Sequence, residues 1–182
     1  MWRDIVPPHF KHKLWRMKER KIYYTHNLES KIKDIKKDIL KDCLKTKHKA
    51  DYNFEIFTKH HDKLYSLFKN TCKKFFKKCT FKNHPTRLYG YYTDQNYSQG
   101  DTWHNHKNTC TICGVLYLKT VKEYGIELKY NNKIFYFEPK NFDLLIFPGF
   151  LDHRPLIHKT KKRVSIQFEI FCNESSEEIF FH

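Results

Sequence analysis

The sequence predicts an α+β protein, mainly β, in which two helices precede an antiparallel barrel or jelly roll. Three observations carry this prediction. Apolar residues recur at helical spacing only within residues 29–82, and from about 87 to 171 they fall into short alternating runs. Close turns separate these runs, and no helical pattern interrupts them. Several short strands without intervening helices are typical of antiparallel barrels and jelly rolls.

The chain has 182 residues, of which 40% are apolar and 17% aromatic. This length suits one domain with a sizeable core, and the apolar content is too high for a disordered chain. We therefore expect a single domain over residues 1–182. Its expected parts are a basic arm at 1–28, support helices at 29–82, a jelly-roll core at 83–173 and a tail at 174–182.

Both predicted helices combine an apolar stripe with a charged background. In the first, at residues 29–49, the stripe is narrow and consists of Ile32, Ile35, Ile39 and Cys43. In the second, at residues 59–78, it is wider and consists of Leu64, Leu67, Phe68, Cys72, Phe75, Phe76 and Cys79. An apolar stripe needs another element to cover it, so both helices are expected to pack against the sheet.

Strands are predicted from alternation and β-rich composition at residues 87–92, 110–119, 125–130, 133–138, 143–147 and 163–171. Asn131 and Asn132 separate two of them and predict a two-residue hairpin turn. The last strand alternates throughout, because Ser165, Gln167 and Glu169 lie between apolar residues. Residues 94–100 are expected to form a loop.

Charge and cysteine content bear on partners and location. The net charge of +15 would attract nucleic acid or another anionic partner, although an AT-rich coding sequence explains the many lysines equally well. No segment approaches the ~20 apolar residues of a membrane span, and no signal peptide is visible. We expect no membrane partner, a cytoplasmic location (the host cytoplasm for a viral protein), and reduced thiols at the six cysteines.

Three separated pieces of sequence carry the candidate chemistry. His104 and His106 are two residues apart, so in an extended segment both side chains point to the same side and can chelate one ion. His153 follows the apolar run 143–148 and is expected at a strand end. Ten residues later, Arg163 opens the last strand and shares its polar face with Ser165.

The order and spacing of these pieces resemble the iron(II)- and 2-oxoglutarate-dependent dioxygenases of the small prolyl-hydroxylase-like type found in microbes and viruses. The matching features are His104-x-His106, the strand Gly114-Val115-Leu116-Tyr117-Leu118, His153, and Arg163-x-Ser165. The resemblance covers roughly residues 87–171. It departs from the family at His106, where the family has a carboxylate ligand.

The resemblance implies a double-stranded β-helix that hydroxylates a C–H substrate with Fe(2+), 2-oxoglutarate and O2. His104, His106 and His153 would be the metal ligands. The carboxylate of 2-oxoglutarate would meet Arg163, because a guanidinium binds a carboxylate through two parallel hydrogen bonds. Ser165 and Tyr117 would assist in cosubstrate binding. Tyr91 and Trp103 are candidates for substrate binding, and the implied substrate is a protein side chain or a small molecule.

Two alternatives stay open at this point. One is a zinc-stabilised nucleic-acid-binding protein, since Cys110-x-x-Cys113 follows the two histidines closely. Against zinc, residues three apart on one predicted strand face opposite ways. The other alternative is a catalytically inactive jelly-roll binding module, in which the fold persists without the carboxylate ligand.

Overall fold

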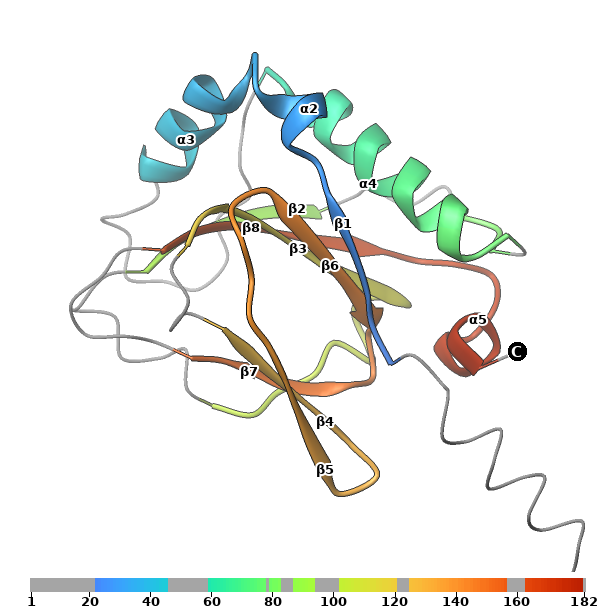
Figure 1. The fold of residues 1–182 in the computed structure, drawn as a ribbon. Coiled ribbons are helices and arrows are strands. Elements are labelled where there is room, and N and C mark those ends of the chain that lie inside the picture. Colours follow the sequence, from blue (N-terminus) through green and yellow to red (C-terminus); the bar gives the residue numbers. More distant parts are fainter. Residues whose placement is uncertain are drawn as a thin grey trace, which may run out of the picture.

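Two antiparallel β-sheets lie one above the other, and helices cover the outer face of the larger sheet (Figure 1). The computed structural model describes residues 22–45, 59–77, 79–82, 87–93, 102–120, 125–156 and 163–181. Within these ranges the fold is mainly β, with few helices, and resembles a jelly roll. The predicted loop at 94–100 and most of the predicted arm lie outside the described residues.

The larger sheet has five strands in the order β1-β6-β3-β8-β2. Its members are β1 (Tyr24–Asn27), β6 (Asp143–Pro148), β3 (Ile112–Lys119), β8 (Arg163–Ile170) and β2 (Arg87–Thr93). The smaller sheet has the order β5-β4-β7. Its members are β5 (Lys133–Phe137), β4 (Ile126–Tyr130) and β7 (Asp152–Pro155). Neighbouring strands are antiparallel throughout.

The predicted hairpin between β4 and β5 is confirmed. Asn131 and Asn132 have φ angles of 48° and 60°, the left-handed conformation that a two-residue turn of this kind requires. Asparagine tolerates positive φ better than most residues, which explains why this pair forms the turn.

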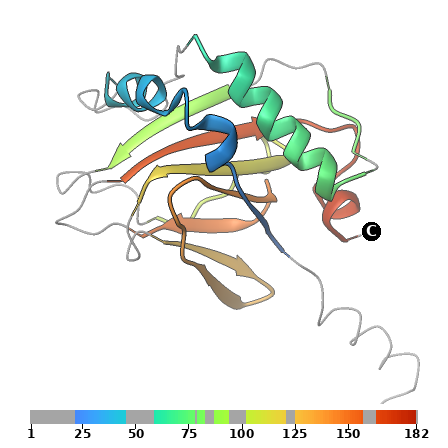
Figure 2. The same ribbon diagram turned by 45° about the horizontal axis from the view of Figure 1, so that its top comes forward.

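The helical layer consists of α2 (Glu29–Ile32), α3 (Lys36–Lys45) and α4 (His61–Phe75). The single helix predicted over 29–49 is therefore interrupted at residues 33–35. There the N–H of Ile35 donates to the carbonyl of Ile32 at 3.1 Å, a tighter turn than an α-helix makes. Both isoleucines remain buried, so the interruption redirects the chain without exposing the apolar stripe. Figure 2 shows α3 and α4 lying across the same sheet face.

Strand β8 divides the molecule into two cores. Its apolar residues Val164, Ile166, Phe168 and Ile170 pack with the helices in the first core. The rings of Phe68 and Phe168 stack there with centroids 4.7 Å apart. A Cβ at Gly114 would clash with the Phe68 ring, so the glycine lets α4 approach β3 closely.

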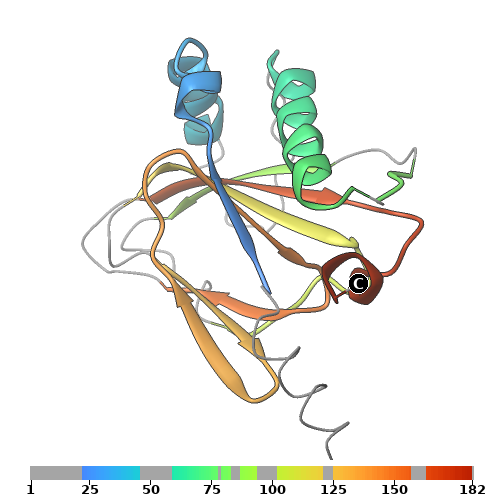
Figure 3. The ribbon, with the colours of Figure 1, turned by 45° about the vertical axis from the view of Figure 1, so that its right-hand side comes forward.

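The second core lies between the two sheets, which Figure 3 shows as separate layers. It includes Cys113, Tyr117, Leu145 and Phe147 from the larger sheet and Leu128 from the smaller one. The polar residues of β8 alternate with those of the first core and therefore face this side of the sheet. They are buried nevertheless, with Ser165 only 3% exposed.

Three short elements were not predicted. Strand β1 lies within the expected irregular arm and pairs with β6. Strand β7 contains His153, which therefore belongs to the smaller sheet and does not lie at the end of β6. Helix α5 (Ser176–Phe181) ends the described chain, with the Ser176 hydroxyl donating to the carbonyl of Thr111 at 2.7 Å. Each element is too short to show periodicity in the sequence.

Cys79 and Cys172 form a disulfide, so the expectation that all six cysteines are reduced is wrong for this pair. An antiparallel bridge between Phe81 and Cys172 brings the two segments together. No motif marks the pair in the sequence, because 93 residues separate its members.

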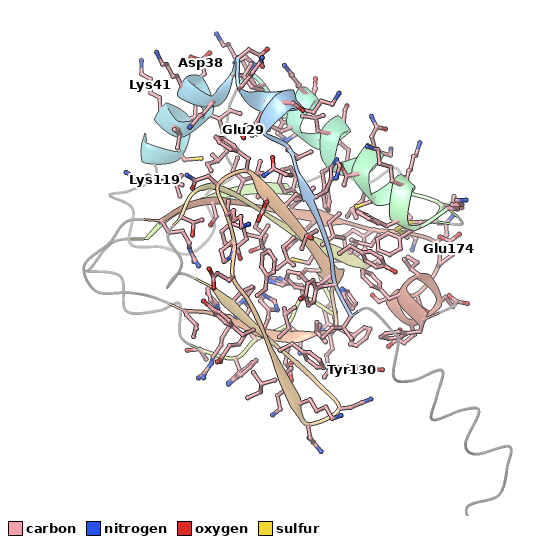
Figure 4. All side chains as sticks on the ribbon, in the orientation of Figure 1. Glu29, Asp38, Lys41, Lys119, Tyr130 and Glu174 are labelled. Carbon is pink, nitrogen blue, oxygen red and sulfur yellow. A yellow bond between two sulfur atoms is a disulfide. The ribbon has the colours of Figure 1, made fainter. Side chains whose placement is uncertain are left out.

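Charged side chains cover the outside of the helical layer. Figure 4 shows Asp38 and Lys41 on the outer side of α3, away from the sheet. Lys59 and His60 both contact the carboxylate of Asp38 at 3.0 Å. None of the helices in the described ranges combines the length and apolarity of a membrane span.

Candidate metal centre

Backbone hydrogen bonds link His104 directly to His153. The two residues form an isolated antiparallel bridge, in which the N–H of His104 donates to the carbonyl of His153 at 3.0 Å and the reverse bond measures 2.8 Å. His153 is also paired with Leu128 of β4. The segment that carries His104 is thus attached to the edge of the smaller sheet.

A second contact fixes His106. Its N–H donates to the carbonyl of Gly149 at 2.7 Å, in the turn between β6 and β7. A Cβ at Gly149 would overlap the carbonyl oxygen of Cys110. The absence of a side chain at Gly149 therefore allows the histidine segment and the β6–β7 turn to meet.

The three predicted ligands form one cluster. Metal-binding atoms of His104, His106 and His153 lie within 4.8 Å of one another, and within the described ranges no other group of three or more potential ligands does. Three nitrogens bound at about 2.1 Å to one ion can be at most ~4.2 Å apart. The rings would have to move closer together to bind one ion, and three imidazoles are a donor set that fits a transition metal.

Each ring has its Nδ1 atom beside an oxygen. Nδ1 of His104 lies 2.9 Å from the carbonyl oxygen of Thr102, and Nδ1 of His153 lies 2.9 Å from that of Leu151. Since a carbonyl only accepts hydrogen bonds, both Nδ1 atoms carry the proton. In His106, Nδ1 lies 3.2 Å from a carboxylate oxygen of Glu169. These contacts place Nε2 of each ring on the side away from the oxygen, and within the described residues only the Nε2 of His106 has a hydrogen-bond partner, the amide of Gln167.

Lowered pKa values keep two of these imidazoles neutral, of which His153 is buried and His104 is exposed. Desolvation lowers the pKa of His104 from its ordinary value. The pKa of His153 is lowered to about 3, mainly by burial and secondly by the charge of His104. Neutral imidazole is the form that binds metal, so both residues are in the ligating state at neutral pH.

The three predicted cosubstrate residues lie together on adjoining strands. Tyr117 of β3 is the register partner of Ser165 of β8, and both are buried. Arg163 is 5% exposed at the start of β8. Burial raises the pKa of the Tyr117 hydroxyl, and the positive charge of Arg163 opposes this rise.

Of the two predicted substrate residues, the structure describes the side chain of Trp103 but only the backbone of Tyr91. The guanidinium of Arg154 lies 4.8 Å from the ring centroid of Trp103, which is partly exposed one residue before His104. Arg154 also donates to a carboxylate oxygen of Glu127 at 2.6 Å. Tyr91 lies in β2 with its Cα opposite Ser165, and its side chain is outside the described part of the structure.

Cys110 and Cys113 do not lie on one strand, contrary to the prediction from the sequence. Strand β3 begins at Ile112, so Cys110 precedes it, and strand alternation does not separate Cys110 from Cys113. Burial is the main cause of a raised pKa at Cys113, which disfavours the thiolate that zinc needs. Neither thiol belongs to the three-ligand cluster.

Sequence reasoning missed two polar residues beside His106. The amide nitrogen of Gln167 lies 3.2 Å from Nε2 of His106 and 3.1 Å from the Glu169 carboxylate. Both residues alternate with the apolar positions of β8, as Arg163 and Ser165 do. Their position on that shared face was the available signal, but a polar face in one strand looks the same whether it meets solvent or a site.

Solved structures of prolyl hydroxylases share this fold. A prolyl-4-hydroxylase from Pseudomonas putida has a TM-score of 0.60 and 11% identity, over 82% of this chain and 91% of that one. A prolyl hydroxylase from Trichoplax adhaerens, in complex with a hypoxia inducible factor peptide fragment, has a TM-score of 0.58 and 10% identity, over 92% and 94%.

A viral collagen prolyl hydroxylase from Paramecium bursaria Chlorella virus-1 has a TM-score of 0.50 and 16% identity, over 83% of this chain and 91% of that one. No family model matches the sequence, and no curated protein sequence matches it. The predicted resemblance is confirmed at the level of the fold: this chain has the iron and 2-oxoglutarate oxygenase fold of the prolyl hydroxylases.

Proposed function

We propose that this protein is an iron(II)- and 2-oxoglutarate-dependent oxygenase that hydroxylates a protein side chain. The observation that carries the proposal is the convergence of three imidazoles inside a prolyl hydroxylase fold. His104 and His153 come from the two sides of one backbone bridge, and His106 is held by the β6–β7 turn. We infer that the sheets form a double-stranded β-helix around this centre.

His104, His106 and His153 would hold Fe(2+) on one face and leave its remaining positions open for other ligands. The bound iron, with 2-oxoglutarate and O2, would supply the oxidant for converting C–H, 2-oxoglutarate and O2 into C–OH, succinate and CO2. The burial of His153 supports this role, because a buried imidazole excludes water from its side of the centre.

Arg163, Ser165 and Tyr117 would bind the cosubstrate. Their support is shared burial on facing positions of β3 and β8, on the same strand face as the residues that contact His106. A buried guanidinium can pair with the far carboxylate of 2-oxoglutarate through two hydrogen bonds. The hydroxyls of Ser165 and Tyr117 add donors to the same carboxylate.

Trp103 would contact the substrate, because it lies next to His104 and is partly exposed. The cationic side chains of Lys129 and Arg154 lie over its ring, at 6.0 and 4.8 Å from the centroid. Tyr91 is the second candidate, since its Cα lies opposite Ser165. A polypeptide substrate is favoured by the shared fold with a prolyl hydroxylase that binds a peptide fragment.

The proposal is tested by loading metal-free protein with Fe(2+) without oxygen, adding 2-oxoglutarate and then air, and measuring succinate by NMR. We expect stoichiometric iron and slow succinate release without an added substrate. His106→Ala should bind iron at least ~10-fold more weakly, since loss of a ligand costs at least as much as loss of a ligand's hydrogen-bond partner. Asp62→Asn on α4 is the control and should behave as the wild type.

Two results would contradict the proposal. Binding of iron and 2-oxoglutarate without any succinate would identify an inactive binding module. Tightly held zinc with no affinity for 2-oxoglutarate would favour the zinc alternative. His106→Asp restores the family's usual ligand type, so comparing its succinate release with that of the wild type shows whether the third imidazole limits turnover.

A further inference from the structure

A carboxylate is buried directly behind one of the three metal-binding imidazoles. Glu169 is 7% exposed and lies near the end of β8, where its Cα is the register partner of Cys113. One of its carboxylate oxygens lies 3.2 Å from Nδ1 of His106 and 3.1 Å from the amide nitrogen of Gln167. Burying a charged group is costly unless it is hydrogen-bonded or paired, so this arrangement needs a physical reason.

Two hydrogen bonds and one charged contact link the three side chains. Gln167 has two amide protons: one reaches the Glu169 carboxylate, and the other reaches Nε2 of His106 at 3.2 Å. Because that amide proton meets Nε2 as an acceptor, Nδ1 of His106 carries the ring proton, and this atom lies 3.2 Å from the Glu169 carboxylate oxygen. The set therefore fixes the same tautomer at His106 that backbone carbonyls fix at His104 and His153.

We propose that Glu169 is the positioning residue of the metal centre, acting through His106. The inference rests on the proposed metal site. A carboxylate that accepts Nδ1–H orients the ring and makes its Nε2 a stronger donor to a metal. Here it also places a negative charge one imidazole away from an ion that has three neutral ligands. His104 and His153 have neutral carbonyl partners, so this charge reaches the centre through His106.

Gln167 contacts both His106 and Glu169. Its amide nitrogen lies 3.2 Å from Nε2 of His106 and donates a hydrogen bond to that atom. His106 would bind a metal through the lone pair of Nε2, while the amide would keep its hydrogen bond to Glu169. The His106 ring is thus already in the tautomer that metal binding requires.

The test compares Glu169→Gln with the wild type. Glutamine has the same shape and still offers an oxygen to Nδ1, but it has no charge. We expect Glu169→Gln to bind Co(2+) about 10- to 100-fold more weakly, followed by its visible absorption in competition with a chelator. Glu127→Gln is the matched control, because Glu127 is a partly buried carboxylate paired with Arg154, and its affinity should stay within about twofold.

Three outcomes are distinguishable. A wild type that does not bind Co(2+) overturns the proposed metal site itself. A wild type that binds, with equal affinity in Glu169→Gln, overturns only the role of Glu169. A weakened Glu169→Gln with an unchanged Glu127→Gln supports it, provided the thermal midpoint of the metal-free variant matches the wild type.

A second measurement needs no variant. In zinc-loaded protein labelled with nitrogen-15, the His106 ring should show a protonated Nδ1 and a metal-bound Nε2. A metal-bound Nδ1 would overturn the inference, because the carboxylate then could not accept a proton from that atom.

Discussion

At the scale of single residues, burial of His153 ties stability to pH. Its pKa is lowered to about 3 in the folded protein, mainly by desolvation. An unfolded histidine titrates near 6.5, so between these values the unfolded chain binds more protons than the folded one. Stability from this group is therefore fully present above about pH 6.5 and is lost as the pH falls toward 3.

We expect the metal-free protein to lose about 2 kcal/mol of unfolding free energy between pH 7 and pH 5 through His153, from ~1.5 pH units at 1.36 kcal/mol each. Urea unfolding with a chelator present measures this loss. His153→Gln has no titrating group and should show a correspondingly smaller dependence on pH. Equal dependence in the two proteins would mean that His153 does not carry the effect.

Arg163 gives the second prediction at this scale. Arg163→Lys keeps the charge but loses the planar pair of donors, so affinity for 2-oxoglutarate should fall by about 1–3 kcal/mol. Calorimetric titration with Mn(2+) in place of iron measures the change. Arg154→Lys, which alters a guanidinium paired with Glu127, should leave the affinity unchanged. An unaltered affinity in Arg163→Lys would exclude Arg163 as the anchor.

At the scale of elements, sequence patterns located the longer strands, and in β3, β4, β6 and β8 most of the apolar residues are buried against a core, whereas β5 is exposed. Strands β3, β4, β5, β6 and β8 all lie within three residues of the predicted bounds. The alternation in β8 was enough to place Arg163 and Ser165 on one face. It could not show that this face is buried, because that depends on the smaller sheet, which pairs residues distant in the sequence.

The elements that were missed are held by tertiary contacts alone. Strand β7 has four residues, Asp152–Pro155, and its ladder is supplied by β4. The interruption between α2 and α3 leaves Ile32 and Ile35 buried, so the helical spacing of the stripe conceals it. The three histidines could be predicted as a set from resemblance, whereas their shared tautomer depends on oxygen atoms that only the folded chain positions.

Helix α4 approaches β3 at Gly114, which gives a prediction for this scale. Gly114→Ala places a methyl group against the ring of Phe68 and should destabilise the protein by about 1–3 kcal/mol. Chemical denaturation measures the loss. Phe68→Leu in the same chain removes the ring, so the double variant should be less destabilised than the sum of the single ones. Additive losses would show that the two residues do not meet.

At the scale of the whole molecule, the two faces of β8 contact different parts of the structure. Its apolar side chains pack with the helices, while Gln167 and Glu169 on its other face contact His106. Shifting this strand would disturb the helical packing and the metal ligands together. We therefore expect the helices and the sheets to unfold as one unit, in keeping with the predicted single domain.

Metal binding tests this cooperativity. A ligand that binds only the folded state stabilises it by about 2.7 kcal/mol at 100 times its dissociation constant. For a chain of this size that corresponds to a rise of roughly 5–11 °C in the thermal midpoint. If the molecule unfolds as one unit, Mn(2+) should raise the midpoint of the helical circular dichroism signal by this amount, although no helix carries a proposed metal ligand.

His106→Ala is the control for this experiment and should show little rise in the midpoint. A helical signal that stays in place, while hydrogen exchange in β3 and β8 slows on adding Mn(2+), would mean that the helical layer unfolds separately and that the single-domain prediction is wrong.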